Sequence, residues 1–229
     1  EMGPDGWDGL MADRQLPMVC GLPDTTGQVS QVLKSCFEQG IKVVPRGSGT
    51  SLSGGALPLA DGVLLGLGKF KRIREIDFDN RVVVTEPGVT NLAISQAVAH
   101  AGFYYAPDPS SQIACSIGGN VAENSGGVHC LKYGMTTNNL LGCEIVLMSG
   151  EIIKVGGKSA EPSGDDLLGI ITGSEGLLGG ITDRAPMDLA TSEGFEFVAL
   201  GRALLRAPDL GPRTPPYPAP PAPCTPPNP

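Results

Sequence analysis

Residues 45–55 read Pro45-Arg46-Gly47-Ser48-Gly49-Thr50-Ser51-Leu52-Ser53-Gly54-Gly55 and follow Ile41-Lys42-Val43-Val44, which is typical of a short strand. Glycine permits positive φ angles and a close approach of the backbone, so successive amides in such a loop can point at one anion. The stretch lacks the GxxxxGK[ST] pattern of phosphate-transferring enzymes, and it is not a GxGxxG sequence that opens a long helix. It therefore predicts an anion-binding cradle made of amides and hydroxyls after a strand.

Two further glycine clusters occupy 117–127 and 173–180. Taken singly, each cluster also fits a tight turn that binds nothing. Cationic residues are scarce around them, since no Lys or Arg lies at 47–68 or at 82–131. If these loops hold a diphosphate, backbone amides, hydroxyls and at most Arg46 must bind it.

The region 15–183 alternates helical and strand patterns, which is typical of α/β packing. Thr26 begins a helix that Gly40 ends, and Thr90 begins a second helix that Gly102 ends. The apolar faces are expected to consist of Val29, Val32, Leu33, Cys36 and Phe37, and of Leu92, Ala93, Ala97 and Val98. Strands are expected at 41–44, 63–67, 73–77 and 81–85, and a hairpin at 143–148 and 152–155.

The chain has 229 residues, with 16 Lys and Arg against 24 Asp and Glu and a formal net charge of -8. Such an acidic chain is a poor electrostatic partner for nucleic acid or for an anionic membrane surface. No apolar run approaches the roughly 20 residues that span a bilayer, and the first residues lack the basic and apolar regions of a signal peptide. We expect no nucleic-acid partner and no transmembrane segment.

The six cysteines form no CxxC pair and show no spacing typical of a zinc site. Their spacing is also unlike that of residues that hold an iron–sulfur cluster. A chain of this size can bury a sufficient core without disulfides. We therefore expect reduced thiols and no metal site.

The composition changes toward the C-terminus. Half of the residues at 208–229 are proline, which lacks an amide donor and fixes φ, so we expect a disordered, extended tail. Two interpretations of this tail stay open: a proline-rich ligand for an aromatic groove on a partner, or a tail without function. Residues 184–207 show neither a period of two nor an amphipathic stripe, and we expect irregular backbone there.

Four motifs, in order, carry a family resemblance: PRGSGTSLSGG at 45–55, PDPSSQ at 107–112, IGGNVAENSGGVHCLKYG at 117–134 and GSEGLLGGITD at 173–183. Together they resemble the FAD-binding domain of the vanillyl-alcohol-oxidase superfamily, also called PCMH-type. Within it, the sequence is similar to the FAD-binding subunits of bacterial glycolate oxidases, which are related to D-lactate dehydrogenases. The resemblance spans 14–183 and implies an α+β, PCMH-type fold of two α/β subdomains with FAD between them.

The resemblance also implies which residues contact FAD. The first cluster would cradle the pyrophosphate, the PDPSSQ motif and the second cluster would line the flavin, its ribityl chain and the diphosphate, and the third cluster would border the adenosine. The implied residues are Pro45, Arg46, Gly47, Ser48, Gly49, Thr50, Ser51, Pro107, Asp108, Ser110, Ile117, Gly118, Gly119, Asn124, Ser125, Gly126, Glu175, Gly176, Leu177, Gly179 and Ile181.

Some members of this family tether the flavin through a histidine in the first loop. This chain has Gly49 and Thr50 in that place and no histidine in the loop, so we expect non-covalent FAD. We expect His129 to be an ordinary hydrogen-bonded side chain and His100 to be solvated on a helix. The residues identify no catalytic base.

By the resemblance, the parent activity would oxidise a 2-hydroxy acid, glycolate or D-lactate, to the 2-oxo acid by hydride transfer to flavin N5. The resemblance ends after Asp183, where relatives continue into a substrate-binding cap domain, so we expect a fragment that binds FAD and lacks part of the catalytic machinery.

The resemblance also implies a second flavin-binding subunit and an iron–sulfur subunit as partners. Through those partners it implies a cytoplasmic location at the inner membrane face. The alternative is a non-catalytic nucleotide-binding or interaction module whose proline-rich tail binds a partner.

Overall fold

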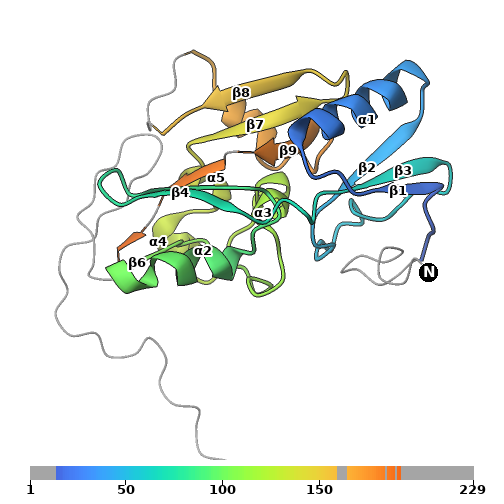
Figure 1. Cartoon of the computed structure of the whole chain (residues 1–229). Helices are drawn as coiled ribbons and strands as arrows, with labels where there is room; N and C mark the ends of the chain where they lie inside the picture. Colours follow the sequence, from blue (N-terminus) through green and yellow to red (C-terminus); the bar gives the residue numbers. More distant parts are fainter. Residues whose placement is uncertain (1–13, 159–163, 184, 189, 192–229) are drawn as a thin grey trace, which may run out of the picture.

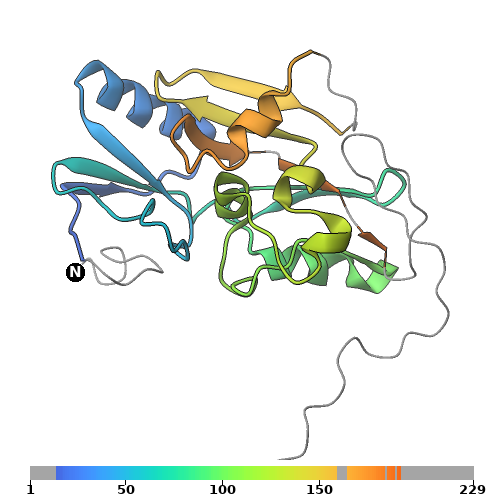
Figure 2. The same cartoon turned by 180° about the vertical axis from the view of Figure 1, so that it is seen from behind.

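A computed structural model of the chain describes residues 14–158, 164–183, 185–188 and 190–191. The proline-rich stretch 208–229, for which we predicted disorder, lies outside the described residues. The described part is a mixture of helices and sheets, as expected, and Figures 1 and 2 show its arrangement from opposite sides. Within it, no helix has the length and apolar character needed to cross a bilayer.

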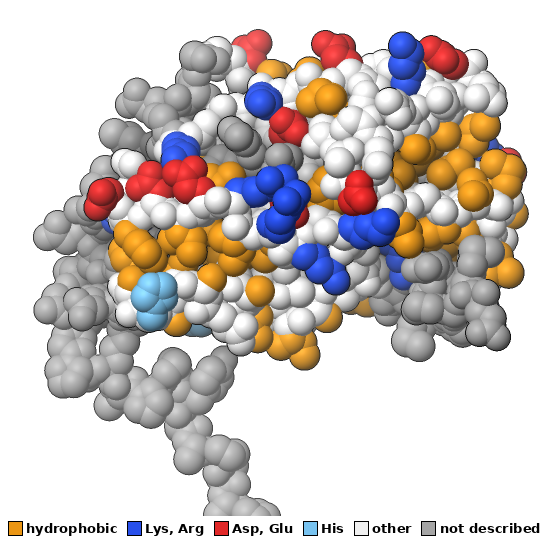
Figure 3. All heavy atoms as spheres, viewed as in Figure 1, with side chains coloured by type: hydrophobic (Ala, Val, Ile, Leu, Met, Phe, Trp, Pro, Cys, Tyr) orange, Lys and Arg blue, Asp and Glu red, His pale blue; other side chains and the backbone are white. Residues whose placement is uncertain are grey.

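The N-terminal sheet is parallel, with β3 (Gly62–Gly66) between β1 (Val19–Gly21) and β2 (Lys42–Arg46). Helix α1 (Thr26–Glu38) connects β1 to β2, which confirms the first predicted helix. Figure 3 shows hydrophobic side chains on the side of the molecule where this sheet lies.

The amino end of α1 is capped by Thr25, whose hydroxyl accepts a hydrogen bond from the Gln28 amide at 3.2 Å. Its carboxyl end is followed by Gly40, which has a φ of 66°. Val29, Leu33 and Cys36 are buried as predicted. Phe37 is exposed, so its expected place in the apolar face is wrong.

A second, antiparallel sheet has β5 (Val82–Thr85) between β4 (Ile73–Asp77) and β10 (Ala185–Asp188). A short strand β11 (Ala190–Thr191) pairs with β6 (Phe103–Tyr104). Strands β10 and β11 lie in the segment 184–207, where we expected irregular backbone. The structure differs from this expectation because β10 and β11 form by pairing with strands far away in the sequence. A local sequence pattern does not reveal such pairing.

The third sheet is antiparallel, with β7 (Gly142–Leu147) between β8 (Ile152–Gly156) and β9 (Gly179–Asp183). The hairpin of β7 and β8 is confirmed, and its turn contains Gly150 with a φ of 86°. Strand β9 begins inside the third glycine cluster, where the sequence pattern does not predict a strand.

Helix α2 (Asn91–Val98) is capped by Thr90, as predicted, and runs into a 3-10 turn η2 (Ala99–Ala101) before Gly102. Val98 is buried, but the other fully buried apolar side chain is Ile94, which the prediction missed; Leu92, Ala93 and Ala97 are half-buried. The remaining helices are short: α3 (Ile117–Glu123), α4 (Cys130–Tyr133), α5 (Thr136–Asn139) and α6 (Leu167–Ile171).

Strand β7 joins two hydrophobic cores. Successive side chains of a strand point to opposite faces, and Ile145 packs into a core formed with α2, α3, α6 and β5, whereas Val146 packs with α1 and β3. Helix α1 also hydrogen-bonds to β7, because the Thr26 hydroxyl donates to Glu144 Oε1 at 3.0 Å. The two cores are therefore coupled through one central strand.

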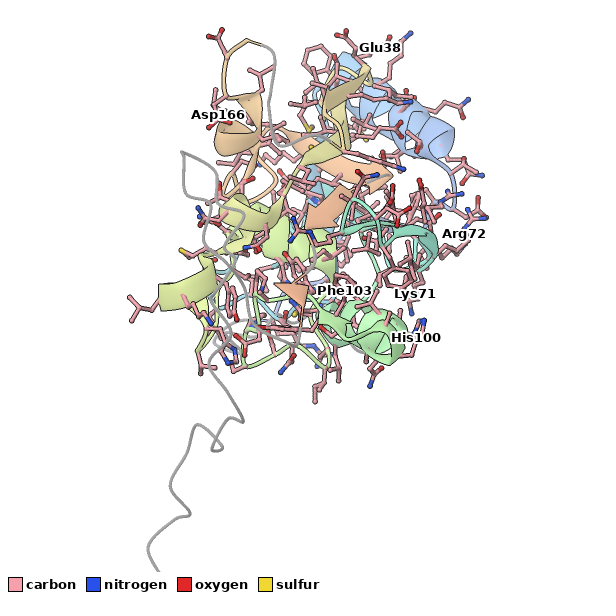
Figure 4. All side chains as sticks on the ribbon, turned by 90° about the vertical axis from the view of Figure 1, so that its left-hand side faces the viewer. Glu38, Lys71, Arg72, His100, Phe103 and Asp166 are labelled. Carbon is pink, nitrogen blue, oxygen red and sulfur yellow. The ribbon has the colours of Figure 1, made fainter. Side chains whose placement is uncertain are left out.

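A buried carboxylate fixes the turn after β5. Glu86 is 1% exposed and accepts hydrogen bonds from the Arg72 amide at 2.7 Å and from Arg72 Nε at 3.0 Å, while Arg74 Nη2 lies 2.7 Å from its Oε1. Figure 4 shows Arg72 and Lys71 at the outer edge of the molecule. The next residue, Pro87, accepts a hydrogen bond from the Gly118 amide at 2.8 Å. Glu86 thus holds the turn on which α3 starts.

Replacing Glu86 by alanine should lower the free energy of unfolding by about 2 kcal/mol, because the Arg72 amide and two guanidinium groups lose their charged acceptor. Urea denaturation measures this change. The matched control is Asp61→Ala, which breaks the exposed ion pair with Lys42 at 2.8 Å and should change stability little. Equal effects of the two substitutions would contradict the anchoring role of Glu86.

All five cysteines within the described residues are free thiols, and they differ in exposure. Cys130 is exposed, whereas burial raises the pKa of the Cys143 thiol to about 12. Because the thiolate is the reactive form, iodoacetamide should modify Cys130 and spare Cys143 in the folded chain. Peptide mass spectrometry reads the labelling, and both residues should react after unfolding. Equal labelling of the two in the folded chain would count against the buried position of Cys143.

Candidate functional site

A cleft of about 490 Å³ opens where the three glycine clusters meet. Its wall is formed by the loop after β2, by α3 and the residues just after it, and by the segment between α6 and β9. Figures 1 and 2 show α3 at the centre of the molecule, between the N-terminal sheet and the layer that contains α2. The three clusters, far apart in the sequence, therefore surround one space.

Most residues predicted to contact a ligand line this cleft. The whole first group does so, and the second and third clusters contribute residues from the opposite sides. The predicted residues in the wall are Pro45, Arg46, Gly47, Ser48, Gly49, Thr50, Ser51, Gly118, Gly119, Ser125, Glu175, Gly176, Gly179 and Ile181.

The other predicted residues lie outside the wall, in one of three situations. Some are buried in the fold, some are exposed, and some bond to neighbouring segments. They are Pro107, Asp108, Ser110, Ile117, Asn124, Gly126 and Leu177.

Their contacts show what several of them do instead. Ile117 is fully buried in the larger core, whereas Leu177 is 83% exposed. The Pro107 carbonyl accepts a hydrogen bond from Asn91 Nδ2 at 2.8 Å. Asn124 ends α3 with a φ of 51°, and its Oδ1 accepts from the Thr137 amide at 3.0 Å.

Two glycines of the first loop lie in tight contact with neighbouring side chains. A Cβ on Gly47 would overlap Ser116 Oγ, and a Cβ on Gly49 would lie 2.7 Å from Cζ of Arg46. Gly49 also has a φ of 67°, which disfavours any side chain. Arg46 is nearly buried, and its Nη1 donates to the Ala56 carbonyl at 3.1 Å. The loop thus folds around its own guanidinium group and against α3.

The third cluster is bonded to α3. The Gly173 amide donates to the Val121 carbonyl at 2.9 Å, and the Glu175 amide donates to the Ala122 carbonyl at 2.8 Å. Gly176, with a φ of 80°, lies so close to Pro45 that a Cβ would be 2.9 Å from the proline Cγ. Backbone contacts therefore hold the three sides of the cleft together.

Charge in the cleft wall is unevenly distributed. Among the described residues that line it, Arg46 is the one Lys or Arg side chain, and Glu123 and Glu175 are the carboxylates. The Ser53 hydroxyl donates to Glu123 Oε2 at 3.2 Å, so the first loop also touches α3 through side chains. The arrangement suits an anion beside Arg46 and hydroxyl groups beside the carboxylates.

Residues that the sequence interpretation missed complete the wall. Among the side chains that the structure describes, Ser116 Oγ and Asn120 Nδ2 are buried there without a hydrogen-bond partner. A helix prediction over α3 would have placed these two on one face, since they are four residues apart. Leu52, Ser53 and Gly55 belong to the cradle predicted at 45–55, and the wall residues that were missed are Ala56, Leu67, Pro87, Ser111, Cys115, Ser116, Asn120, Ala122, Glu123, Ile145, Ile171, Ser174 and Gly180.

Neither histidine lines the cleft. His129 is hydrogen-bonded, as expected, with Asp108 as its partner at 2.7 Å from Nδ1 to Oδ2. His100 is exposed at the end of α2, as Figure 4 shows, and its ring contacts that of Phe78 with centroids 5.8 Å apart. Over the described residues, no group of three or more His, Cys, Asp or Glu side chains is arranged to hold a metal ion.

Comparison with known proteins agrees with this geometry. The profile of a family described as "FAD binding domain" matches residues 17–156. The chain is 54% identical over 183 residues to the protein named "Glycolate oxidase subunit GlcD" of Escherichia coli (strain K12), a match that covers 80% of this chain and 37% of that protein. It is also 43% identical over 161 residues to a D-lactate dehydrogenase of Archaeoglobus fulgidus, covering 70% of this chain and 36% of the relative.

A solved structure shares the fold. Alkyldihydroxyacetonephosphate synthase superposes with a TM-score of 0.66 at 21% identity, over 75% of this chain and 31% of that protein. The chain therefore spans only a little over a third of the length of the curated relatives above.

Valine in place of Gly47 or Gly49 should weaken FAD binding at least about tenfold, because the new Cβ displaces the loop from α3 or from Arg46. Titration of FAD fluorescence against each purified variant measures the affinity. Gly68→Val is the matched control, since no atom lies within 4 Å of its Cβ position and its φ is not positive. Unchanged FAD affinity in both loop variants would contradict the assignment of the first loop.

Proposed function

The chain belongs to the family of FAD binding domains, and on that premise we propose that it holds FAD non-covalently in the cleft between its three glycine clusters. The observation that carries the proposal is the first loop, in which Gly47 and Gly49 are pressed against Ser116 and Arg46. A loop of this kind presents main-chain amides and hydroxyls to an anion, with one guanidinium nearby. FAD has an anionic diphosphate, and its ribose and ribityl hydroxyls suit the carboxylates of Glu123 and Glu175.

We assign the residues of the cleft to parts of FAD by this chemistry. Residues 46–51 bind the diphosphate, Gly118, Gly119 and Ser125 border the flavin side, and Glu175 to Ile181 border the adenosine side. Of the predicted residues outside the wall, Asn124 supports it by ending α3. The two hydrophobic cores are our basis for proposing two α/β subdomains with FAD between them.

We further propose that the whole protein oxidises a 2-hydroxy acid, glycolate or D-lactate, to the 2-oxo acid. Bound FAD would supply the hydride acceptor. The residues of this chain bind the cofactor, orient it and exclude water from its diphosphate. The support is the similarity to a glycolate oxidase subunit and to a D-lactate dehydrogenase.

One observation favours a second candidate, a module that binds FAD without turnover. The described cleft wall contains no His, Lys or Tyr, and its ionisable side chains are Arg46, Cys115, Glu123 and Glu175. Of these, Glu123 already accepts a hydrogen bond from the Ser53 hydroxyl, and both glutamates are assigned above to hydroxyl groups of FAD. In that case the groups that contact the substrate come from another part of the protein or from a partner.

We also propose partner subunits and a cellular location for the whole protein. The E. coli relative is named as a subunit, and by analogy we propose a second flavin-binding subunit and an iron–sulfur subunit as electron-transfer partners. A cytoplasmic place at the inner membrane face, through these partners, follows from the same analogy.

The purified chain incubated with FAD should show a visible flavin spectrum after gel filtration. Acid precipitation should leave all of the flavin in the supernatant, because the first loop offers no histidine for a covalent bond. Flavin that stays with the precipitate would contradict non-covalent binding. A colourless protein that does not change FAD fluorescence would overturn the proposed function.

Anaerobic addition of glycolate or D-lactate to the FAD complex separates the two candidates. Bleaching of the flavin absorbance supports the oxidoreductase, and a stable spectrum with bound FAD supports the binding module.

A further inference from the structure

Two unpaired polar side chains in the cleft wall need an explanation. Ser116 is 3% exposed and Asn120 is 2% exposed, and within the described part of the chain neither Ser116 Oγ nor Asn120 Nδ2 has a hydrogen-bond partner. Buried polar atoms of folded proteins are nearly always hydrogen-bonded, and an unpaired one destabilises the fold. Apolar side chains at these two positions would remove that penalty.

The positions of the two side chains point to a ligand. Ser116 precedes α3 but makes no side-chain capping bond to it, so its hydroxyl remains available. Asn120 lies four residues later, on the same face of the helix. A Cβ on Gly47 would overlap Ser116 Oγ, which lies 3.3 Å from the Cβ position of Gly119. Ser116 thus belongs to the part of the wall that meets the first loop, and Asn120 lines the same cleft.

The chemistry of these atoms restricts what they can bind. The NH2 group of asparagine only donates hydrogen bonds, and a serine hydroxyl can also donate. Their partner in the cleft must therefore carry acceptor atoms, as the diphosphate and the flavin ring of FAD do.

We infer that Ser116 and Asn120 are cofactor-positioning donors, which bind acceptor atoms of FAD and leave the ligand-free fold less stable than it could be. The inference rests on the proposed binding of FAD in this cleft. This role of Ser116 and Asn120 has a consequence that a purely structural role of the two side chains would not have. Removing either donor should weaken FAD binding while stabilising the chain without FAD, so that the two effects have opposite signs.

The test uses Asn120→Leu, which keeps a similar side-chain volume. FAD affinity should fall about tenfold, the loss expected for a hydrogen bond to a polar or charged acceptor. The melting temperature of the ligand-free chain, measured by circular dichroism, should rise by about 2–4 °C. Ser116→Ala should change both quantities in the same directions and is the milder substitution.

Three control variants separate this account from others. Asn120→Ala is too small to obstruct the cleft, so a loss of FAD affinity in this variant excludes a steric effect of leucine. Thr85→Val removes another buried unpaired hydroxyl outside the wall and should stabilise the chain without changing FAD affinity. Asn139→Leu removes an amide that is satisfied by the carbonyls of Tyr133 and Met135, and should lower the melting temperature.

The outcomes are distinct. If the wild-type chain binds FAD and Asn120→Leu binds it within about twofold of the wild type, the inference is wrong while the proposed function stands. A lower melting temperature of ligand-free Asn120→Leu and Ser116→Ala would also overturn the inference, because the side chains would then have partners in the fold. A wild-type chain that does not bind FAD overturns the proposed function itself.

Discussion

The close contact between the first glycine loop and the start of α3 is the constraint on which the cleft depends. Gly47 lies against Ser116, and Gly49, which has a φ of 67°, lies against the guanidinium of Arg46. The loop that makes this contact lines the cleft, and among the described wall residues it supplies the one Lys or Arg side chain. An acidic chain can hold an anionic cofactor there if the main-chain amides of such a loop supply the positive potential.

The rest of the fold maintains that contact. Glu86, held by Arg72 and Arg74, fixes the turn whose Pro87 carbonyl binds the Gly118 amide, and this bond places the start of α3. The third cluster then bonds to the end of α3. Strand β7 connects the core beneath α1 with the core that contains α3, and both cores contribute side chains to the cleft wall, Leu67 from the first and Ile145 from the second.

Local sequence features predicted only part of this arrangement. The caps Thr25 and Thr90, the glycine stops and the hairpin turn are local, and the elements that they bound were found. Helix α3 was not predicted because two glycines weaken its propensity and the carbonyls of Pro87 and Val89 support it from a distance. Ser116 and Asn120 were missed for the same reason. Residues 45–51 of the first loop, which were predicted to contact the ligand, all line the cleft, because glycine itself carries the information there.

The most direct test is a crystal structure of the chain with FAD. The account predicts the diphosphate within hydrogen-bond distance of the amides of residues 47–50, with Arg46 beside it. A diphosphate held elsewhere, by surface lysines for example, would show that the main-chain amides of the first loop do not bind FAD.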